Sequence, residues 1–371
     1  MKNFVKAILY ILSGLAFIIA SAVIFLWLFF NPNQYKSNIS DRIHTITGYT
    51  VHINGEISLS FLPYLSLNIH DVVVDNLPTY SAEHPLATLE KASFGIALIP
   101  LLFDKRIEIH HINLERINLE VIQHSQNDNN IKKLIELVQQ NKTDKPQKKK
   151  EPFTIHIRDI TLKQTTIHWN DQLTHKQGSL FIDSWHSHHV NLNQEPFPVS
   201  LNIRINPPTG NHQINIECSS TLQIDAAFTK FKLNPMIIPI HLIDRDRPTQ
   251  TPHLNIQGIM DYNNETKEIT ATELNVILNQ MPLTLTLNGQ FNPLHFTGHI
   301  TATDVHIIKW LESLGLNIQI PHMPLLSKIK FYSDFVMSKK QIQLVNTHLN
   351  LNNETHLKAE TNFLRPKSQL S

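Results

Sequence analysis

The sequence predicts a mainly β protein with a few short helices behind one transmembrane helix. Hydrophobic residues make up 41% of the 371 residues and charged residues 17%, which favours a folded chain over a disordered one. After residue 50, apolar and polar residues alternate along most of the chain, which is the period of half-buried strands. Residues 7–30 form one apolar run without a charge. These observations together set the fold class.

The apolar run from Ala7 to Phe30 is predicted to span a membrane. At about 1.5 Å per residue, a helix of this length crosses a hydrocarbon core of about 30 Å. Lys2 and Lys6 precede the run, so the short amino terminus is expected in the cytoplasm and the rest of the chain on the other side. Trp27 and Phe30 are expected in an interfacial aromatic belt.

A cleaved signal peptide is the alternative interpretation of this run. Residues 20–22, Ala-Ser-Ala, resemble a cleavage site. Cleavage there would leave VIFLWLFF at the new amino terminus, which is too apolar to be stable in water. We therefore expect an uncleaved anchor.

The remaining chain divides at a linker. Residues 31–141 are predicted to form an amino-terminal β unit with capping helices, and residues 153–371 a second β-rich domain. Residues 142–152, KTDKPQKKKEP, carry five lysines, two prolines and no large apolar residue, as is typical of a solvated linker. Residues 1–30 complete the division as the cytoplasmic stub and anchor.

Within the first unit, apolar residues at helical spacing predict a helix from a cap at Ser37 to a stop at Gly48. Three strands follow, joined by tight turns at residues 54–55 and at Pro63. More strands are expected in residues 86–99 and 107–122, the latter interrupted by a polar break at Glu115-Arg116. A short helix over residues 130–140 closes the unit, because the apolar period changes there to 3.6.

In the second domain the strand signal resumes at Phe153, and we expect more than a dozen strands in the whole chain. Residues 107–122 and 153–169 share a layout of strand, polar turn and strand, which suggests a repeated two-strand unit. One further helix is predicted from a cap at Thr303 to a stop at Gly315. Strands then continue through Leu351.

Composition excludes several classes of protein. The net charge of +1 gives no basis for binding nucleic acid. The single cysteine, Cys218, supports neither an internal disulfide nor a cysteine zinc site. The sequence has no GxGxxG, Walker or GxSxG motif, so we expect neither an enzyme nor a bound cofactor.

Histidine is unusually frequent, with 22 copies and a cluster at His186, His188 and His189. Imidazoles bind zinc and copper, and Asp183 is one candidate for a third ligand. No established ligand spacing is present, however. We therefore expect solvent-exposed loop histidines and no metal site.

The anchor and the segment NPNQYKSNISDRIHTITGYTVHINGEISLSFLPYLSLNIHDVVV resemble the amino-terminal region of AsmA-family proteins. Later segments, DVHIIKWLESLGLNIQIP and LSKIKFYSDFVMSKKQIQLVNTHLNLNN, are similar to a helix and strand pair of that family, so the likeness spans nearly the whole chain. The residues that match the family pattern in the first segment are Thr47, Gly48, Ile53, Gly55, Ile57, Ser60, Pro63, Leu65, Leu67, Val72 and Asn76.

This resemblance implies a single-pass inner-membrane protein of Gram-negative bacteria with a periplasmic body that takes part in outer-membrane biogenesis. It implies an elongated, curled antiparallel sheet with an apolar groove, along which phospholipid passes between the inner and outer membranes. The expected partners are inner-membrane lipids at the anchor, a phospholipid ligand, and outer-membrane or periplasmic assembly proteins. The chain stops at Ser371, earlier than typical members, so we expect either a short member or a truncated product.

The apolar face of alternating strands is the candidate lipid site. Two alternatives stay open: the same side chains fill a closed β-sandwich, or the body is a scaffold that assists outer-membrane protein assembly through its edge strands. A hydrolase on a β scaffold is a third, disfavoured alternative. The predicted groove positions are Ile155, Ile157, Leu201, Ile203, Leu283, Leu285 and Leu287.

Overall fold

The computed structural model describes residues 21, 31–61, 64–81, 84–97, 108–125, 128–143, 157–206, 212–244, 252–313, 329–351 and 355–364. Except for Ser21, the predicted anchor lies outside these residues, including Ala7, Trp27 and Phe30. So does most of the predicted linker. Within the described part of the chain, no helix has both the length and the apolar character needed to cross a membrane.

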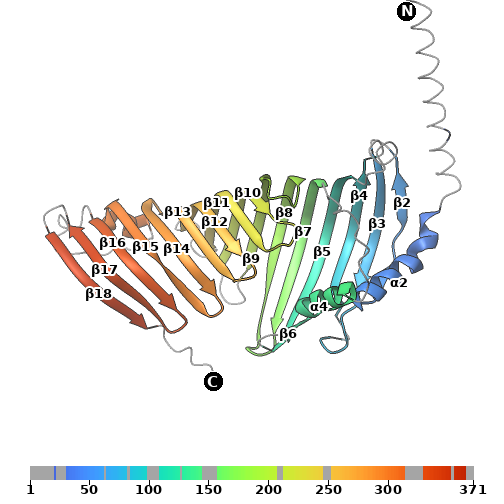
Figure 1. The fold of residues 1–371 in the computed structure, drawn as a ribbon, viewed down its shortest axis with the longest axis horizontal. Helices are drawn as coiled ribbons and strands as arrows, with labels where there is room; N and C mark the ends of the chain where they lie inside the picture. Colours follow the sequence, from blue (N-terminus) through green and yellow to red (C-terminus); the bar gives the residue numbers. More distant parts are fainter. Residues whose placement is uncertain are drawn as a thin grey trace, which may run out of the picture. The chain divides into compact units, whose positions relative to one another are not determined.

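Eighteen strands belong to one sheet, and the pairings whose registers are described are all antiparallel, which confirms the mainly β prediction (Figure 1). The chain divides into two compact units. The first contains Met1–Phe153 and Ile167–Gln177, and the second contains Thr154–Thr166 and Gly178–Ser371. Strand β7 (Ile157–Asp171) contributes residues to both.

The first unit combines short helices with strands that mostly pair in chain order. Strand β3 pairs with β4, β4 pairs with β5, and β5 pairs with β7. The elements are η1 (Pro32–Tyr35), α2 (Lys36–Thr47), β1 (Val51–Ile53), β2 (Ile57–Ser60), β3 (Leu65–Val74), β4 (Ala87–Ile96), β5 (Ile109–Ser125), β6 (Asp128–Asn129) and α4 (Asn130–Thr143).

The second unit is an antiparallel meander in which each strand from β8 to β18 pairs with the next. One helix, α5 (Ile307–Ser313), follows β15. The strands are β8 (Lys176–Val190), β9 (Phe197–Asn206), β10 (His212–Ile224), β11 (Lys230–Asp244), β12 (His253–Asn263), β13 (Glu268–Leu278), β14 (Met281–Phe291), β15 (Leu294–Val305), β16 (Ile329–Ser338), β17 (Gln341–Leu351) and β18 (Thr355–Leu364).

The predicted first helix is present, but its start differs. Gly48 ends α2 in the left-handed conformation, with φ of 74°, and its amide donates to the carbonyl of His44 at 2.7 Å. Ser37 lies inside the helix and is not its cap. The turn η1 precedes α2 instead, and the side chain of Asn31 caps η1 by accepting from the amide of Asn33 at 3.0 Å.

The tight turn predicted at Asn54-Gly55 is not a hairpin between paired strands. Strands β1 and β2 both pair with β3, and the amides of Asn54 and Gly55 both donate to the carbonyl of Asp71, at 2.9 and 3.4 Å. Asp71 has a positive φ of 50°, as expected of a bulged residue. A Cβ atom at residue 55 would lie 2.6 Å from the carbonyl oxygen of His70, so this close approach requires glycine.

The repeated strand-turn-strand unit predicted for residues 107–122 and 153–169 is wrong. The described residues of these segments lie in two long continuous strands, β5 and β7. Each strand instead contains one polar residue at positive φ, Arg116 at 55° and Gln164 at 54°. A strand can include such a residue as a local irregularity without reversing its direction. The polar residues common to the two segments therefore mark distortions within strands and not turns between them.

The helix predicted from Thr303 is also wrong at its start, because β15 continues to Val305 and α5 begins at Ile307. The register of β15 shifts between Ala302 and Val305, and both residues are buried in one apolar cluster. Gly315 lies outside the described residues. The sequence prediction also missed β18.

The interior of the first unit is organised around Asn130, at the start of α4. Helix α4 contacts α2, β5 and β6 (Figure 1). The Asn130 side chain, which is 0% exposed, accepts from the amide of Ile122 at 3.0 Å and donates to the carbonyl of Glu120 at 2.7 Å. Its own carbonyl accepts from the hydroxyl of Tyr49 at 3.0 Å. One buried residue therefore joins the helix, a strand and the segment after α2, through its side-chain amide and its backbone carbonyl.

Replacing Asn130 by Ala is expected to destabilise the first unit by about 1–3 kcal/mol for each buried backbone group that is left without a partner. Hydrogen-exchange mass spectrometry on the full chain should show faster exchange in peptides that cover β5 and α4. The matched control is Asn118→Ala, since that exposed amide bonds only the Thr88 hydroxyl, at 3.1 Å. Equal exchange in the two variants would contradict the role given to Asn130.

Candidate functional site

A row of apolar side chains crosses the second unit on one face of the sheet. Direct cross-strand partners share a face, and residues two apart on one strand share it too. Ile238 pairs with Ile256, and Ile256 pairs with Val276. This apolar stripe consists of Ile182, Leu201, Ile203, Ile216, Ile238, Ile240, Leu254, Ile256, Val276, Leu278, Met281, Leu283, Ala302, Phe331, Leu349 and Leu357.

The stripe is continuous because each strand from β8 to β18 contributes at least one member. Two small buried clusters lie along it. One is centred on Met236, Ala271 and Leu274, and the other on Ala302 and its neighbours. The stripe therefore contains two places where side chains are closely packed and buried, and the rest of it is a larger, less buried apolar surface.

Most members of the stripe are only half-buried. Of its residues only Ala302 is buried, while Leu357 is 50% exposed. In a β-sandwich a facing sheet would cover such side chains. The described strands of the second unit all belong to one sheet, and none of them belongs to a second sheet that could face it. In the described part of the chain, the stripe is therefore a largely half-buried apolar surface.

Five predicted groove residues lie on this face, all half-buried. Leu201, Ile203 and Leu283 belong to the stripe, and Leu285 and Leu287 pack against the cluster of Met236, Ala271 and Leu274. Ile157 is the half-buried first residue of β7, and Ile155 lies outside the described residues.

The sequence prediction missed much of the stripe, for example Ile256, Val276 and Phe331. The signal was present as apolar pairs two residues apart, such as Ile238 and Ile240. Bulges interrupt it, as between Ala271 and Leu274, where the buried positions are three residues apart. Alternation by itself therefore could not extend the row from strand to strand.

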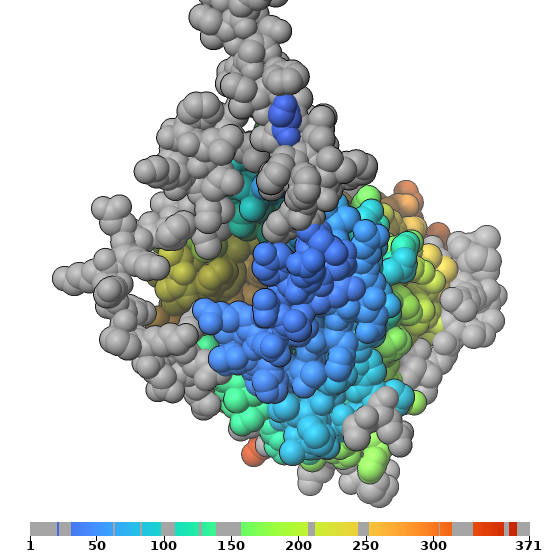
Figure 2. All heavy atoms as spheres, turned by 90° about the vertical axis from the view of Figure 1, so that its right-hand side faces the viewer, coloured from blue at the N-terminus to red at the C-terminus, as the bar shows by residue number. Residues whose placement is uncertain are grey.

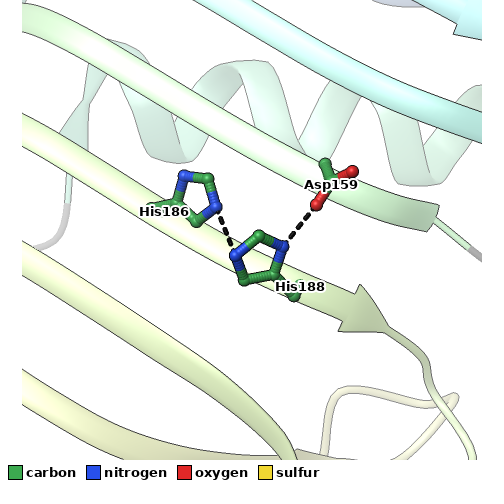
Figure 3. Close-up of side chains that lie close together, drawn as sticks. All are labelled: Asp159, His186 and His188. Atoms are coloured by element: carbon green, nitrogen blue, oxygen red, sulfur yellow. Dashed lines mark hydrogen bonds and ion pairs between the residues drawn. The ribbon is translucent and has the colours of Figure 1, made fainter.

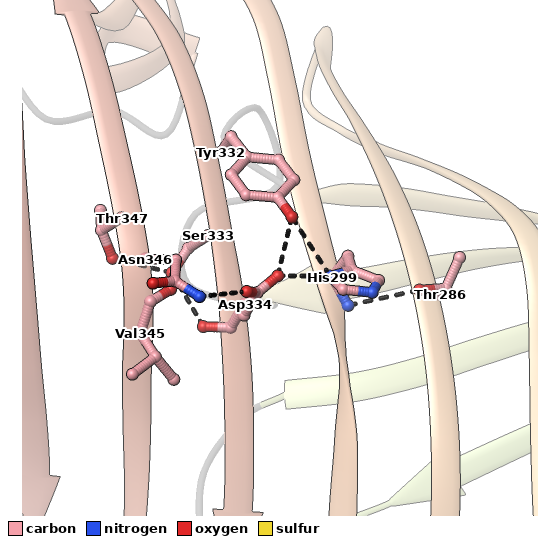
Figure 4. Close-up of polar contacts among 8 residues, drawn as sticks. All are labelled: Thr286, His299, Tyr332, Ser333, Asp334, Val345, Asn346 and Thr347. Carbon is pink, nitrogen blue, oxygen red and sulfur yellow. Dashed lines mark hydrogen bonds and ion pairs between the residues drawn. The ribbon is translucent and has the colours of Figure 1, made fainter.

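A group of polar side chains lies on the opposite face of β15 to β17, and Figure 4 draws its contacts. Asp334 accepts from the Asn346 amide and the Tyr332 hydroxyl, both at 2.8 Å, and it also contacts His299. These hydrogen bonds, that from Asn346 foremost, lower the pKa of Asp334 to about 2. On the stripe face itself, Ser333 follows Phe331 by two residues, is buried, and bonds the Thr347 hydroxyl at 2.8 Å (Figure 4). The carboxylate of Asp334 and its partners therefore lie on the face opposite the stripe, which is itself mainly apolar.

A separate apolar pocket of about 340 Å³ lies in the first unit, between η1, α2 and strands β2 to β4. Figure 2 shows this end of the unit, with α2 and the first strands in blue. Pro32, the first residue of η1, lies two positions after the end of the predicted anchor. The residues lining the pocket are Pro32, Tyr35, Ile39, Ile57, Leu59, Leu65, Leu67, Phe94 and Ile96.

The prediction that the histidine cluster lies in a loop is wrong. His186, His188 and His189 are on strand β8. Asp183 is not their partner either, because it forms a bidentate ion pair with Arg204, at 2.6 and 2.7 Å. The neighbouring carboxylate is Asp159 of β7, which contacts His188 (Figure 3). Sequence spacing could not show this pairing, since 29 positions separate the two residues.

Replacing Asp334 by Asn is expected to reduce the acid sensitivity of the second unit. A carboxyl with a lowered pKa adds stability that is present in full above its ordinary pKa of 3.8 and is lost as the pH falls toward about 2. Urea unfolding midpoints of the full chain, measured from pH 5 to pH 2, should therefore fall less in Asp334→Asn than in the unsubstituted protein. Identical pH profiles would contradict this account.

Comparison with known proteins follows the sequence resemblance. No curated protein matches the chain. A model of the AsmA family matches residues 1–196, which include the first unit, strand β8 and the histidine cluster. This match covers more than half of the 371 residues. The chain belongs to the AsmA family.

Proposed function

We propose that this AsmA-family chain is anchored in the inner membrane of a Gram-negative bacterium and carries phospholipid toward the outer membrane along the apolar stripe. Its body lies in the periplasm, and its role is in outer-membrane biogenesis. The observation that carries the proposal is the stripe itself, because it runs across every strand from β8 to β18 and stays half-buried. Membership of the AsmA family agrees with a transport or assembly role without catalysis.

The stripe suits acyl chains for a physical reason. Each CH₂ group removed from water contributes about 0.8 kcal/mol, without any directional contact. A row of mostly aliphatic side chains therefore binds hydrocarbon at many similar positions, and a lipid can advance without losing one specific partner. A charged headgroup would stay in water at the margin of the stripe. No single residue has to be a specific ligand in this mechanism.

The apolar pocket of the first unit is the proposed place where a lipid leaves the inner membrane. Its lining includes Pro32 and Tyr35, which come directly after the predicted anchor. A volume of about 340 Å³ accommodates part of an acyl chain and excludes a whole two-chain lipid. The pocket would therefore receive a chain end first.

Photocrosslinking tests the position of the lipid. With p-benzoylphenylalanine at Leu283, irradiated cells are expected to yield phospholipid adducts, because this side chain lies on the stripe. The matched control is the same substitution at Thr284, the exposed neighbour that points to the other face of β14. Protein adducts at both sites, without lipid, would support a scaffold for outer-membrane protein assembly instead.

Charge on the stripe should remove the lipid. The full chain, purified in mild detergent, is expected to copurify with phospholipid that native mass spectrometry and extraction detect. The triple change Leu283→Asp, Leu285→Asp and Leu287→Asp should abolish copurification of the lipid. An acyl chain that covered these carboxylates would remove them from water, which costs free energy. The control places the same charges on the other face of β14, at Thr284, Thr286 and Asn288. Lipid retained in the first variant would refute the groove.

A further inference from the structure

The polar face of the second unit contains a second group of converging side chains, away from the apolar stripe. We propose that His186 and His188 of β8, with Asp159 of β7, form a site for a divalent transition-metal ion of the zinc or copper type (Figure 3). All three residues belong to the second unit. Among the described residues, these three side chains form the group whose candidate ligand atoms lie within 4.8 Å of one another, and the two imidazoles are the proposed ligands.

The placement of the two histidines follows from the strand. Residues two apart project from the same side of β8, so both imidazoles extend over the same patch of sheet. The cross-strand partner of His186 is the exposed Ser200, whereas the partner of Trp185 is Leu201 of the stripe. The pair therefore lies on the face opposite the stripe, and an ion there would not compete with an acyl chain.

The geometry brings the same nitrogen of each ring together. Nε2 of His186 lies 2.7 Å from Nε2 of His188. Two nitrogens bound to one tetrahedral zinc ion at about 2.0–2.1 Å are separated by about 3.3 Å. A rotation of the exposed His188 side chain that moves its Nε2 by about 0.6 Å opens the pair to that separation.

The Nδ1 atoms of both histidines face side chains of β7. Nδ1 of His188 contacts a carboxylate oxygen of Asp159, and Nδ1 of His186 lies 3.4 Å from the Thr161 hydroxyl. A carboxylate on Nδ1 keeps the proton there, which leaves the Nε2 lone pair of His188 directed at the site. A carboxylate behind a ligating histidine in this way fixes the orientation of its ring. Asp159 is therefore a positioning residue for His188.

The site is accessible and weakly charged, as a reversible metal site requires. The side chain of His188 is 49% exposed and that of Asp159 is 26% exposed. One cation, Arg158, approaches Asp159, with its Nε 3.9 Å from the carboxylate. Two imidazoles and open positions for water suit zinc or copper better than calcium or magnesium, which prefer oxygen ligands.

A second histidine pair supplies a matched control. His241 and His253, on β11 and β12, approach with their Nδ1 atoms at 2.8 Å. Their contact uses Nδ1 from both rings, and the metal-ligand group of the described residues does not include them. If the number of nearby histidines alone determined metal affinity, this pair would bind as well as the first.

The test uses the full chain in detergent, purified with a tag that lacks histidine and freed of metal by EDTA. Calorimetric titration with Zn²⁺ should show one tight equivalent, which the double change His186→Gln and His188→Gln removes. The double change His241→Gln and His253→Gln should leave it intact. Asp159→Asn should keep the stoichiometry and weaken binding by about 10–100-fold.

Three results would overturn the proposal: no tight equivalent in the unsubstituted protein, its survival in the first variant, or its loss in the second. Copper electron paramagnetic resonance supplies a measurement that needs no variant. At one equivalent of Cu²⁺, splitting from two nitrogen ligands supports the site, and a spectrum without nitrogen splitting excludes it. Circular dichroism of each variant distinguishes loss of the site from loss of the fold.

Discussion

The structure depends on the antiparallel backbone ladder, because it places direct cross-strand partners on one face of the sheet. From β11 to β18 the ladder matches Ile238, Ile256, Val276 and Leu283 in succession, and then continues to Leu357. A slip of one residue in any pairing would move an apolar side chain to the polar face. The stripe and the polar clusters opposite it are therefore two consequences of the same register.

Bulges keep that register across strands whose sequences do not alternate strictly. In β13 the register shifts between Ala271 and Leu274, and Glu273 adopts a positive φ of 53°. Both apolar residues are buried in the same cluster although they are three positions apart. Ala302 and Val305 of β15 repeat this arrangement. Each bulge thus places an apolar side chain on the same face as the residue three positions before it, whereas strict alternation would place it on the opposite face.

The two faces support two independent proposals. A lipid on the apolar stripe needs area and continuity, and it tolerates exchange of one aliphatic side chain for another. A metal ion at His186 and His188 needs two ring nitrogens at a defined distance and a carboxylate that orients His188. Replacement of either histidine by another residue would therefore remove a ligand. One sheet provides both because its faces are chemically separate. The face opposite the stripe also contains the carboxylate of Asp334, whose hydrogen bonds lower its pKa.

The sequence by itself determined the class of fold, the resemblance to the AsmA family and the presence of apolar faces, because period, composition and local motifs are properties of neighbouring residues. It predicted the end of α2 at Gly48 and the helix after residue 130. Only the tertiary structure decided that β5 and β7 are unbroken, that Asp183 pairs with Arg204, and that Asp159 reaches His188. These facts depend on register and on contacts between strands, and a bulge of one residue changes them while leaving composition and most of the local periodicity intact.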